Sequence, residues 1–210
     1  MKNLRIEVIK YAKMLNSKKL SALRSGNISV RHKDGFLITP SGTKYSSLKN
    51  KDIVFVSLKG EFNQEKGAPS SEWRFHQDIY LNKKDAQAIV HAHSNCATAI
   101  STHEIAIPAF HYMVAMAGGN DIKCAKYATY GTRELSRNIL KALKNRSACL
   151  IGNHGQIAFS ENLSKAFELA EEVENLSNQY INALKIGKPK TLSSKEMNKV
   201  LSKAKNYKRG

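Results

Sequence analysis

Residues 89–94 have the sequence Ile89-Val90-His91-Ala92-His93-Ser94, an apolar run that ends in a His-x-His pair. Such a run is typical of a short buried strand. Because side chains alternate along a strand, His91 and His93 are expected on the same face, about 7 Å apart along the backbone. Two imidazoles placed in this way can bind one metal ion.

A third histidine ends a second apolar run, Leu150-Ile151-Gly152-Asn153-His154-Gly155. Three histidines with an exchangeable fourth position are the composition of a catalytic zinc site. A His-x-His pair by itself is weak evidence, since two hydrogen-bonded histidines at the end of a strand fit it equally well. At this point the pattern leaves both interpretations open.

Apolar periodicity predicts a layered α/β protein. Helical spacing covers residues 2–23, 132–143, 163–185 and 194–206, and shorter helices are expected after Ser70-Ser71 and at 94–102. Strands are expected at 28–31, 36–39, 53–58, 89–93, 149–151 and 156–159. We therefore expect one domain across residues 1–210, with a basic and mobile segment from about residue 188.

Two short glycine-containing segments are candidates for anion binding. Gly26-Asn27 precedes one strand of a predicted hairpin, and Pro40-Ser41-Gly42 follows the other. In an antiparallel pair these two ends are neighbours, and convergent backbone N–H groups in such turns bind phosphate. Two ordinary turns are the simpler alternative, and the sequence alone favours it.

The segment Ser70-Ser71-Glu72 lies where a helix should begin. The serines can cap that helix or bind an anion at its N-terminus. Glu72 is expected in the first turn, where a surface carboxylate complements the helix dipole. The alternative is that Glu72 acts as a general base near the metal. For His76, one turn later, packing or hydrogen bonding is a better interpretation than metal ligation.

The net charge of +17 raises the question of nucleic-acid binding. Residues 1–24 hold seven Lys/Arg against one Glu, and residues 185–210 hold nine against one. The remainder holds 18 basic and 15 acidic residues, so the excess lies at the ends. We interpret it as solvated surface charge and expect no nucleic-acid partner, because no aromatic platform or binding module accompanies it.

Membrane and secretory classes are not indicated. The sequence has no run of 18 apolar residues, and its first residues do not form a signal peptide. Its three cysteines, Cys96, Cys124 and Cys149, are too widely spaced for a disulfide framework or a Cys-x-x-Cys metal site. A cytoplasmic protein is the expectation.

Taken in order, five motifs resemble the class II, zinc-dependent sugar-phosphate aldolases of the aldolase/adducin superfamily. They are Gly26-Asn27-Ile28-Ser29, Thr39-Pro40-Ser41-Gly42, Ser70-Ser71-Glu72, His91-Ala92-His93 and Asn153-His154-Gly155. Segments within 108–135, such as Ala117-Gly118-Gly119-Asn120, are most similar to the branch that cleaves L-fuculose 1-phosphate. The resemblance extends from about residue 4 to Tyr207.

This resemblance implies a three-layer α/β/α fold with a mixed, mostly antiparallel central sheet. It also implies a fourfold-symmetric homotetramer with active sites at subunit interfaces. The implied reaction is zinc-dependent cleavage of a ketose 1-phosphate, foremost L-fuculose 1-phosphate, to dihydroxyacetone phosphate and L-lactaldehyde.

The resemblance also implies roles for individual residues. His91, His93 and His154 match zinc ligands, and Glu72 matches an acid/base residue that also ligates the metal. Tyr112 matches a proton donor from a neighbouring subunit, and Tyr207 matches a mobile C-terminal tyrosine. The implied phosphate pocket consists of Gly26, Asn27, Ser41, Gly42, Ser70 and Ser71.

Two positions depart from the family pattern. Ser41 stands where many relatives have threonine, which keeps the hydroxyl, and Tyr130 stands where the most similar branch has phenylalanine near the aldehyde.

Other activities on the same scaffold remain open. Pentulose-phosphate 4-epimerases tend to have aspartate at the position of Glu72, which argues against them. A methylthioribulose-phosphate dehydratase keeps the histidines and the glutamate, but the 108–135 segments favour an aldolase. A related deoxy-sugar phosphate aldolase is the main alternative. The non-enzymatic adducin branch lacks the metal ligands that are present here.

Overall fold

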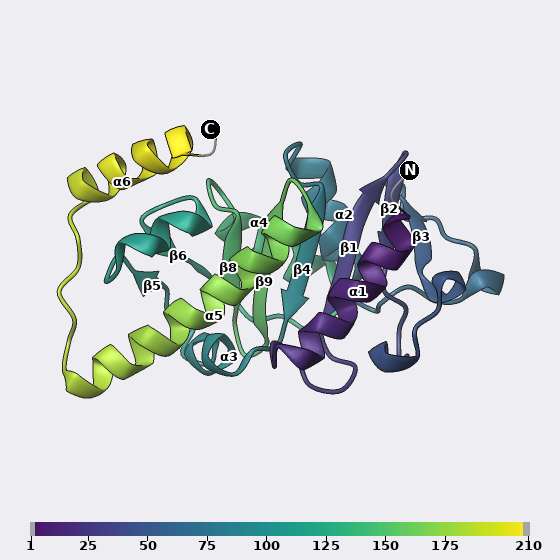
Figure 1. The fold of residues 1–210 in the computed structure, drawn as a ribbon, viewed down its shortest axis with the longest axis horizontal. Helices are drawn as coiled ribbons and strands as arrows, with labels where there is room; N and C mark the ends of the chain where they lie inside the picture. The colour runs from purple at the N-terminus through teal and green to yellow at the C-terminus, as the bar shows by residue number, and fades with distance from the viewer. Residues whose placement is uncertain (1–2, 208–210) are drawn as a thin grey trace.

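A twisted β-sheet lies between two layers of helices in the computed structural model (Figure 1). The structure describes residues 3–207, except for the side chains of Lys66 and residues 205–207. The helices α1, α3 and α5 cover one face of the sheet, and α2 and α4 cover the other. This arrangement confirms the α/β class and the three-layer α/β/α architecture expected from the sequence.

The described elements have the following bounds. The α-helices are α1 (Leu4–Ser17), α2 (Trp73–Asn82), α3 (Asn95–Ser101), α4 (Arg133–Ala142), α5 (Leu163–Ile186) and α6 (Ser194–Tyr207). The 3-10 helices are η1 (Tyr45–Ser47), η2 (Asn50–Asp52), η3 (Gln64–Lys66) and η4 (Tyr112–Ala117). The strands are β1 (Asn27–His32), β2 (Gly35–Ile38), β3 (Val54–Ser57), β4 (Ala88–Ala92), β5 (Ile107–Pro108), β6 (Asp121–Ile122), β7 (Cys124–Ala125), β8 (Ala148–Ile151) and β9 (Gly155–Ser160).

Among the described residues, the main sheet has seven strands in the order β3-β2-β1-β4-β9-β8-β7. Its neighbouring strands are antiparallel except for the pair β7 and β8, which is parallel. The sheet is therefore mixed and mostly antiparallel. A separate ribbon of β5 and β6 lies beside it. The strand β4 occupies the centre, between β1 and β9.

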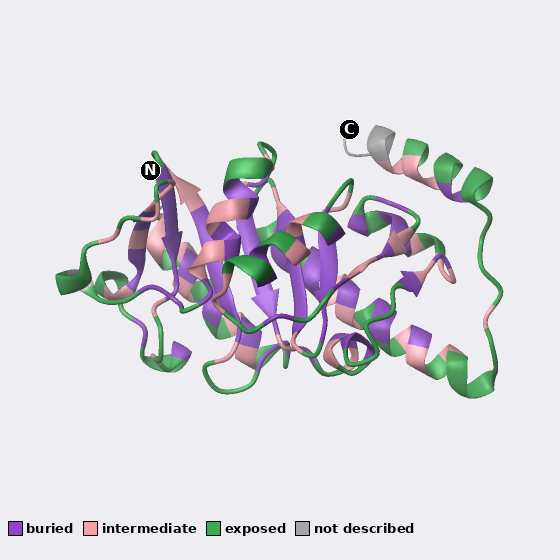
Figure 2. Ribbon diagram, turned by 180° about the vertical axis from the view of Figure 1, so that it is seen from behind, coloured by how far each residue is buried: buried purple, intermediate pink, exposed green. Residues whose placement is uncertain are grey.

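Side chains alternate along β4 between two apolar cores. Val90 and Ala92 belong to the core beneath α1, α3 and α5, whereas Ile89 belongs to the core beneath α2 and α4. His91 follows the same alternation and packs edge-on against Phe75 of α2. All five residues of β4 are buried, and the strands at the centre of the sheet are largely purple in Figure 2. This alternation directs His91 toward the side of the sheet from which Glu72 approaches.

The first helix is shorter than the sequence predicts. Helical spacing continues to residue 23, but α1 ends at Ser17. The chain then turns through Lys19 in a left-handed conformation, with φ of 57°. The N–H groups of Leu20 and Ser21 both donate to the Leu15 carbonyl. Residues 18–26 consequently form a loop that leads toward Gly26.

The C-terminal helix lies apart from the sheet, at the end of an extended connection after α5 (Figure 1). It packs on η4, and its Met197 is fully buried. The Leu192 N–H also donates to the Ala109 carbonyl at 2.8 Å. The mobility expected of this segment stays a prediction. Among the described helices, none is both long and apolar enough to cross a membrane.

Replacing Phe167 by alanine should destabilise the protein strongly. Phe167 lies on α5, is 1% exposed, and packs its ring against Tyr11 of α1 at 5.4 Å. Truncating a buried phenylalanine leaves a cavity and costs about 3–5 kcal/mol. Urea unfolding of Phe167→Ala should show this loss. Ile6→Ala removes a side chain that is 55% exposed and should cost less than about 1 kcal/mol. Equal losses in the two variants would contradict this packing.

Candidate active site

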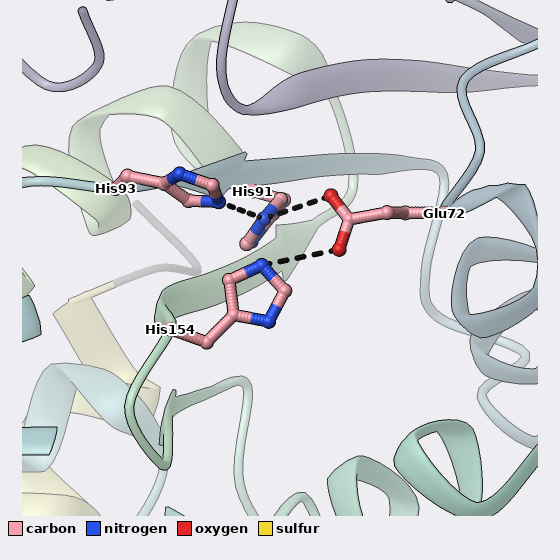
Figure 3. A group of neighbouring side chains, drawn as sticks. All are labelled: Glu72, His91, His93 and His154. Carbon is pink, nitrogen blue, oxygen red and sulfur yellow. Dashed lines mark hydrogen bonds and ion pairs between the residues drawn. The ribbon is translucent and has the colours of Figure 1, made fainter. Parts of the chain in front are cut away.

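Four side chains from separate parts of the chain converge at one end of the central strands (Figure 3). His91 lies in β4 and His93 directly follows it. His154 lies in the turn between β8 and β9, and Glu72 directly precedes α2. One ligand atom from each of the four lies within 4.8 Å of the others. The structure thus brings together the four residues that the sequence suggests as metal ligands.

The three imidazole rings form a regular triangle, with every pair of ring centroids 4.8 Å apart. His91 Nδ1 is 2.8 Å from the backbone carbonyl oxygen of Gln156. A carbonyl only accepts hydrogen bonds, so Nδ1 carries the ring proton of neutral His91. Its Nε2 lone pair is therefore directed into the cluster, where it lies 2.9 Å from His93 Nε2.

Glu72 is at the N-cap position of α2 but does not cap the helix. The sequence predicts it in the first turn, as a surface carboxylate or as a base. Instead its side chain is buried, with Oε2 3.2 Å from His91 Nε2 and Oε1 3.1 Å from His154 Nε2. Oε1 nevertheless accepts no hydrogen bond. The surface interpretation is therefore wrong.

The protonation states of Glu72 and His93 favour the binding of a cation between them. Burial opposes the charge on Glu72, but its contacts with the His91 and His154 rings lower the pKa of its carboxyl well below the usual range. Burial, with a further contribution from His91 and His154, lowers the pKa of His93 to about 3. His93 is therefore neutral at physiological pH, with a lone pair free to bind a metal. The buried Glu72 Oε1, which lacks a hydrogen bond, is a further available ligand atom.

This donor set fits a divalent metal ion. Neutral imidazole nitrogens and one carboxylate oxygen are ligands that Zn²⁺ and similar borderline ions accept. The backbone carbonyl of Gln156 orients the His91 ring through its other nitrogen, as outer groups do at metal sites.

A cavity of about 450 Å³ opens beside the cluster. Glu72, His93 and His154 form part of its wall. Two loops, joined by a short antiparallel bridge between Pro40 and Pro69, form another part of the wall. A ligand in this cavity can therefore contact the cluster and the loops together.

The loops contain the residues that the sequence suggested for phosphate. Gly26, Asn27, Ser41, Gly42, Ser70 and Ser71 all line the cavity. Pairing of β1 with β2 brings Gly26-Asn27 close to Ser41-Gly42. The Thr39 N–H, just after β2, donates to the Ile28 carbonyl of β1 at 3.1 Å. Their phosphate-binding role stays a prediction, although their position at one cavity fits it.

The two tyrosines named from the sequence are placed differently. Tyr112 begins η4, is 53% exposed, and is not among the residues lining this cavity. Its action in a neighbouring subunit stays a prediction. Tyr207 is the last residue of α6, and its side chain lies outside the described part of the chain.

Sequence reasoning missed Arg24, which lines the cavity and donates from Nη1 to the Gly42 carbonyl at 2.8 Å. Among the described lining residues it alone carries a permanent positive charge. The apolar spacing continues to residue 23 and so groups Arg24 with the solvated charge of the first helix. Its position directly before Ser25-Gly26-Asn27 was the available signal. Tyr127 also lines the cavity and was not anticipated.

The family is identified by comparison with known proteins. Residues 6–181 match the family model described as "Class II Aldolase and Adducin N-terminal domain". The chain belongs to the class II aldolase and adducin family. It is a class II aldolase, because curated relatives that are 48% and 50% identical to it are named as aldolases.

Two curated relatives illustrate the range of substrates. A 5-methylthioribulose-1-phosphate/5-deoxyribulose-1-phosphate aldolase of Rhodospirillum rubrum is 48% identical over 97% of this chain and 92% of its own. The L-fuculose phosphate aldolase of Escherichia coli K12 is 50% identical over 87% of this chain and 85% of its own. These similarities support the aldolase class without separating the two substrates.

A solved structure of an L-fuculose 1-phosphate aldolase has the same fold. It superimposes with a TM-score of 0.93 at 40% identity, covering 98% of this aldolase and 97% of the solved chain. This agreement confirms the expected family fold.

Removing one imidazole should abolish tight metal binding. We expect His154→Ala to lower the affinity for Zn²⁺ by more than about tenfold, because the cluster loses a ligand. His103→Ala removes an exposed histidine after α3 and should bind Zn²⁺ as the unaltered protein does. Competition with a chromogenic chelator measures both affinities. Unchanged Zn²⁺ affinity in His154→Ala would show that the four residues do not form the metal site.

Proposed function

We propose that this class II aldolase uses Zn²⁺ to cleave L-fuculose 1-phosphate into dihydroxyacetone phosphate and L-lactaldehyde. The observation that carries the proposal is a single cavity bordered by the Glu72–histidine cluster and by the glycine- and serine-containing loops. The 50% identity to an enzyme named for this substrate supports the choice. The cytoplasm is the proposed location.

The loops hold the phosphate of the substrate. Ser41, Ser70 and Ser71 offer hydroxyl groups, and Gly26 and Gly42 allow close approach of the backbone. Gly26 has φ of 77°, a conformation that favours glycine, and a Cβ there would lie 2.7 Å from the His91 carbonyl. Binding the phosphate at a distance from the breaking bond fixes the reacting carbon atoms beside Glu72.

His91, His93, His154 and Glu72 would hold the metal. When bound, Zn²⁺ supplies Lewis-acid stabilisation of the negative charge that develops on the ketone oxygen, worth several kcal/mol. The histidines are suited to this task because neutral ligands leave the positive charge of the ion intact.

Glu72 moves a proton at the dihydroxyacetone carbon. Cleavage breaks the C3–C4 bond, leaves the electron pair on the C3 side, and requires a proton at C3. The 4-hydroxyl group must lose a proton as the aldehyde forms. Glu72 is 7% exposed and lines the cavity, so its carboxylate is shielded from water and near the substrate.

Tyr112 serves the aldehyde oxygen from a neighbouring subunit of a homotetramer. Its exposure on η4, away from the cavity of its own chain, supports this assignment. Tyr207, at the end of α6, is proposed to act at the same aldehyde side. Tyr127 and Tyr130 line the cavity and are positioned to influence which aldehyde fits.

A 5-deoxypentulose 1-phosphate is the second candidate substrate. The observation that favours it is the R. rubrum relative, which aligns over 97% of this chain, compared with 87% for the E. coli fuculose enzyme. Breaking the same C3–C4 bond of 5-deoxyribulose 1-phosphate also yields dihydroxyacetone phosphate, together with acetaldehyde. The bond-breaking step is the same for both substrates. They differ only in the aldehyde portion that the cavity must accommodate.

An assay of dihydroxyacetone phosphate release tests the proposal directly. Zinc-loaded protein should release it from L-fuculose 1-phosphate, lose this activity with a chelator, and recover it with Zn²⁺. The value of kcat/KM should exceed that for 5-deoxyribulose 1-phosphate and 5-methylthioribulose 1-phosphate. Glu72→Gln keeps the side-chain shape and should retain bound Zn²⁺ while losing most of kcat.

A separate result would contradict each part of the proposal: the substrate, the role of Glu72 and the cleavage itself. A higher kcat/KM for a 5-deoxypentulose phosphate would transfer the activity to the second candidate. Near-normal turnover in zinc-loaded Glu72→Gln would remove its role as acid and base. Absence of dihydroxyacetone phosphate from all three substrates would refute the proposed cleavage.

Arg24 should contribute to binding of the phosphate rather than to the bond-breaking step. We expect Arg24→Gln to raise KM roughly five- to tenfold with kcat little changed, as when a solvent-accessible contact to an anion is lost. Lys144→Gln removes an exposed cation that does not line the cavity and should leave KM unchanged. Equal KM values in both variants and the unaltered enzyme would exclude Arg24 from phosphate binding.

A further inference from the structure

The strand β1 presents a polar strip inside an otherwise apolar layer. Its residues Ile28 and Val30 belong to the core beneath α1 and α5. On the other face, toward α2, the alternate positions are Asn27, Ser29 and Arg31. Asn27 and Ser29 are 2% and 0% exposed. Burying such groups is costly unless each is hydrogen-bonded, so their partners matter.

The helix α2 supplies those partners from His76 and Tyr80. His76 is fully buried, with Nε2 in hydrogen-bond contact with Asn27 Oδ1 and Nδ1 2.7 Å from Ser29 Oγ. The Tyr80 hydroxyl lies 2.8 Å from the same Ser29 oxygen. The contacts therefore connect Tyr80, Ser29, His76 and Asn27 in one buried chain.

The chain ends at Glu72, and this end fixes the direction of its hydrogen bonds. Asn27 Nδ2 is 3.0 Å from Glu72 Oε2. An ionised carboxylate only accepts hydrogen bonds, so the Asn27 NH₂ group must face Glu72 and its carbonyl oxygen must face His76. His76 Nε2 must then carry the ring proton and donate it to Asn27 Oδ1.

The remaining contacts agree with this direction. With its proton on Nε2, neutral His76 accepts a hydrogen bond at Nδ1 from the Ser29 hydroxyl, and Ser29 in turn accepts from Tyr80. Burial, with a smaller contribution from His91, lowers the pKa of His76 to about 3, so the ring is neutral at physiological pH. Its single N–H is thus committed to Asn27.

The orientation of Asn27 also determines what Ser70 can do. Ser70 Oγ accepts from Asn27 Nδ2 at 3.0 Å and from the Glu72 backbone N–H at 3.3 Å. These two hydrogen bonds use both lone pairs of the Ser70 oxygen. Toward a further ligand, Ser70 can therefore act only as a donor, through its hydroxyl hydrogen. Ser70 lines the cavity. Its O–H group is therefore suited to donate to an anionic ligand there.

We propose that His76 is a positioning residue that locks the Asn27 side-chain amide, and through it orients the Ser70 hydroxyl as a donor to the substrate phosphate. This inference rests on the proposed function, because it assigns the phosphate to the cavity beside Ser70. His76 itself does not touch the ligand. Without its N–H, the Asn27 amide can rotate, and a rotated amide presents its oxygen toward Glu72 and Ser70.

Calorimetric binding of inorganic phosphate to the zinc-loaded protein tests this role apart from turnover. His76→Phe keeps a ring but removes the N–H, and it should weaken phosphate binding roughly tenfold, the effect of losing one hydrogen bond to a charged group. His76→Gln places an amide near the level of Nε2 and should restore most of the affinity. Zinc content should be unchanged in both.

Tyr80→Phe is the matched control. It removes a hydroxyl group from the same buried chain and should lower the melting temperature, but Ser29 still donates to His76 and the His76 N–H remains in place. Its phosphate affinity should equal that of the unaltered protein. If His76→Phe does not fold, His76→Asn, whose shorter amide reaches only the level of Nδ1, removes the same donor and should weaken phosphate binding equally.

The outcomes separate this inference from the proposed function. Phosphate affinity that falls in His76→Phe and recovers in His76→Gln supports the positioning role. Unchanged affinity in folded His76→Phe or His76→Asn overturns it, as does an equal loss in Tyr80→Phe, which would indicate general loosening. Failure of the unaltered, zinc-loaded protein to bind phosphate would overturn the phosphate site and this inference together.

Discussion

The register of three central strands is the constraint on which the site depends. Pairing of β1 with β4 sets Asn27 opposite His91, and pairing of β4 with β9 sets Ala92 opposite Gln156. A shift of one residue would turn every side chain of β4 to the other face. The apolar residues of β4 prevent such a shift, because Ile89 and Val90 fill separate cores. Packing thereby holds the ligands in place.

The polar side chains of the site lie against a sheet that is otherwise covered by apolar residues. Their burial determines which of them carry a charge. Removal from water lowers the pKa of His76 and of His93, which favours the neutral form of both rings. The same burial would penalise the Glu72 carboxylate if the imidazoles and the Asn27 amide did not surround it. A cation at the cluster therefore complements the buried Glu72 carboxylate. Glu72 directly precedes α2 and His76 lies one turn later, so the start of this helix contributes to the cluster and to the buried hydrogen-bonded chain.

The sequence predicts side-chain orientation along a strand well, because it follows from local periodicity. It predicts the ends of helices and very short strands poorly. The His91–His93 pair follows from the two-residue repeat of a strand, and the structure confirms that their rings converge. Apolar spacing overextended the first helix to residue 23, and so Arg24 was assigned to solvent-exposed charge rather than to the cavity. The short strands β6 and β7 were also missed, because two residues carry no periodic signal.

By itself, the sequence determined the fold class, because apolar periodicity distinguishes strands from helices. Residue type and spacing left the metal and phosphate interpretations open, and the resemblance of five motifs to a known family named the candidate ligands and loops. Only the tertiary structure decided that the cluster and the loops share one cavity, and that Glu72 turns inward rather than capping its helix. It also decided that His76 contacts Asn27, a residue 49 positions earlier in the chain. The physical reason is that these contacts join elements far apart in the sequence, such as Glu72 with His154 and Asn27 with His76, and their geometry depends on how strands, helices and loops pack.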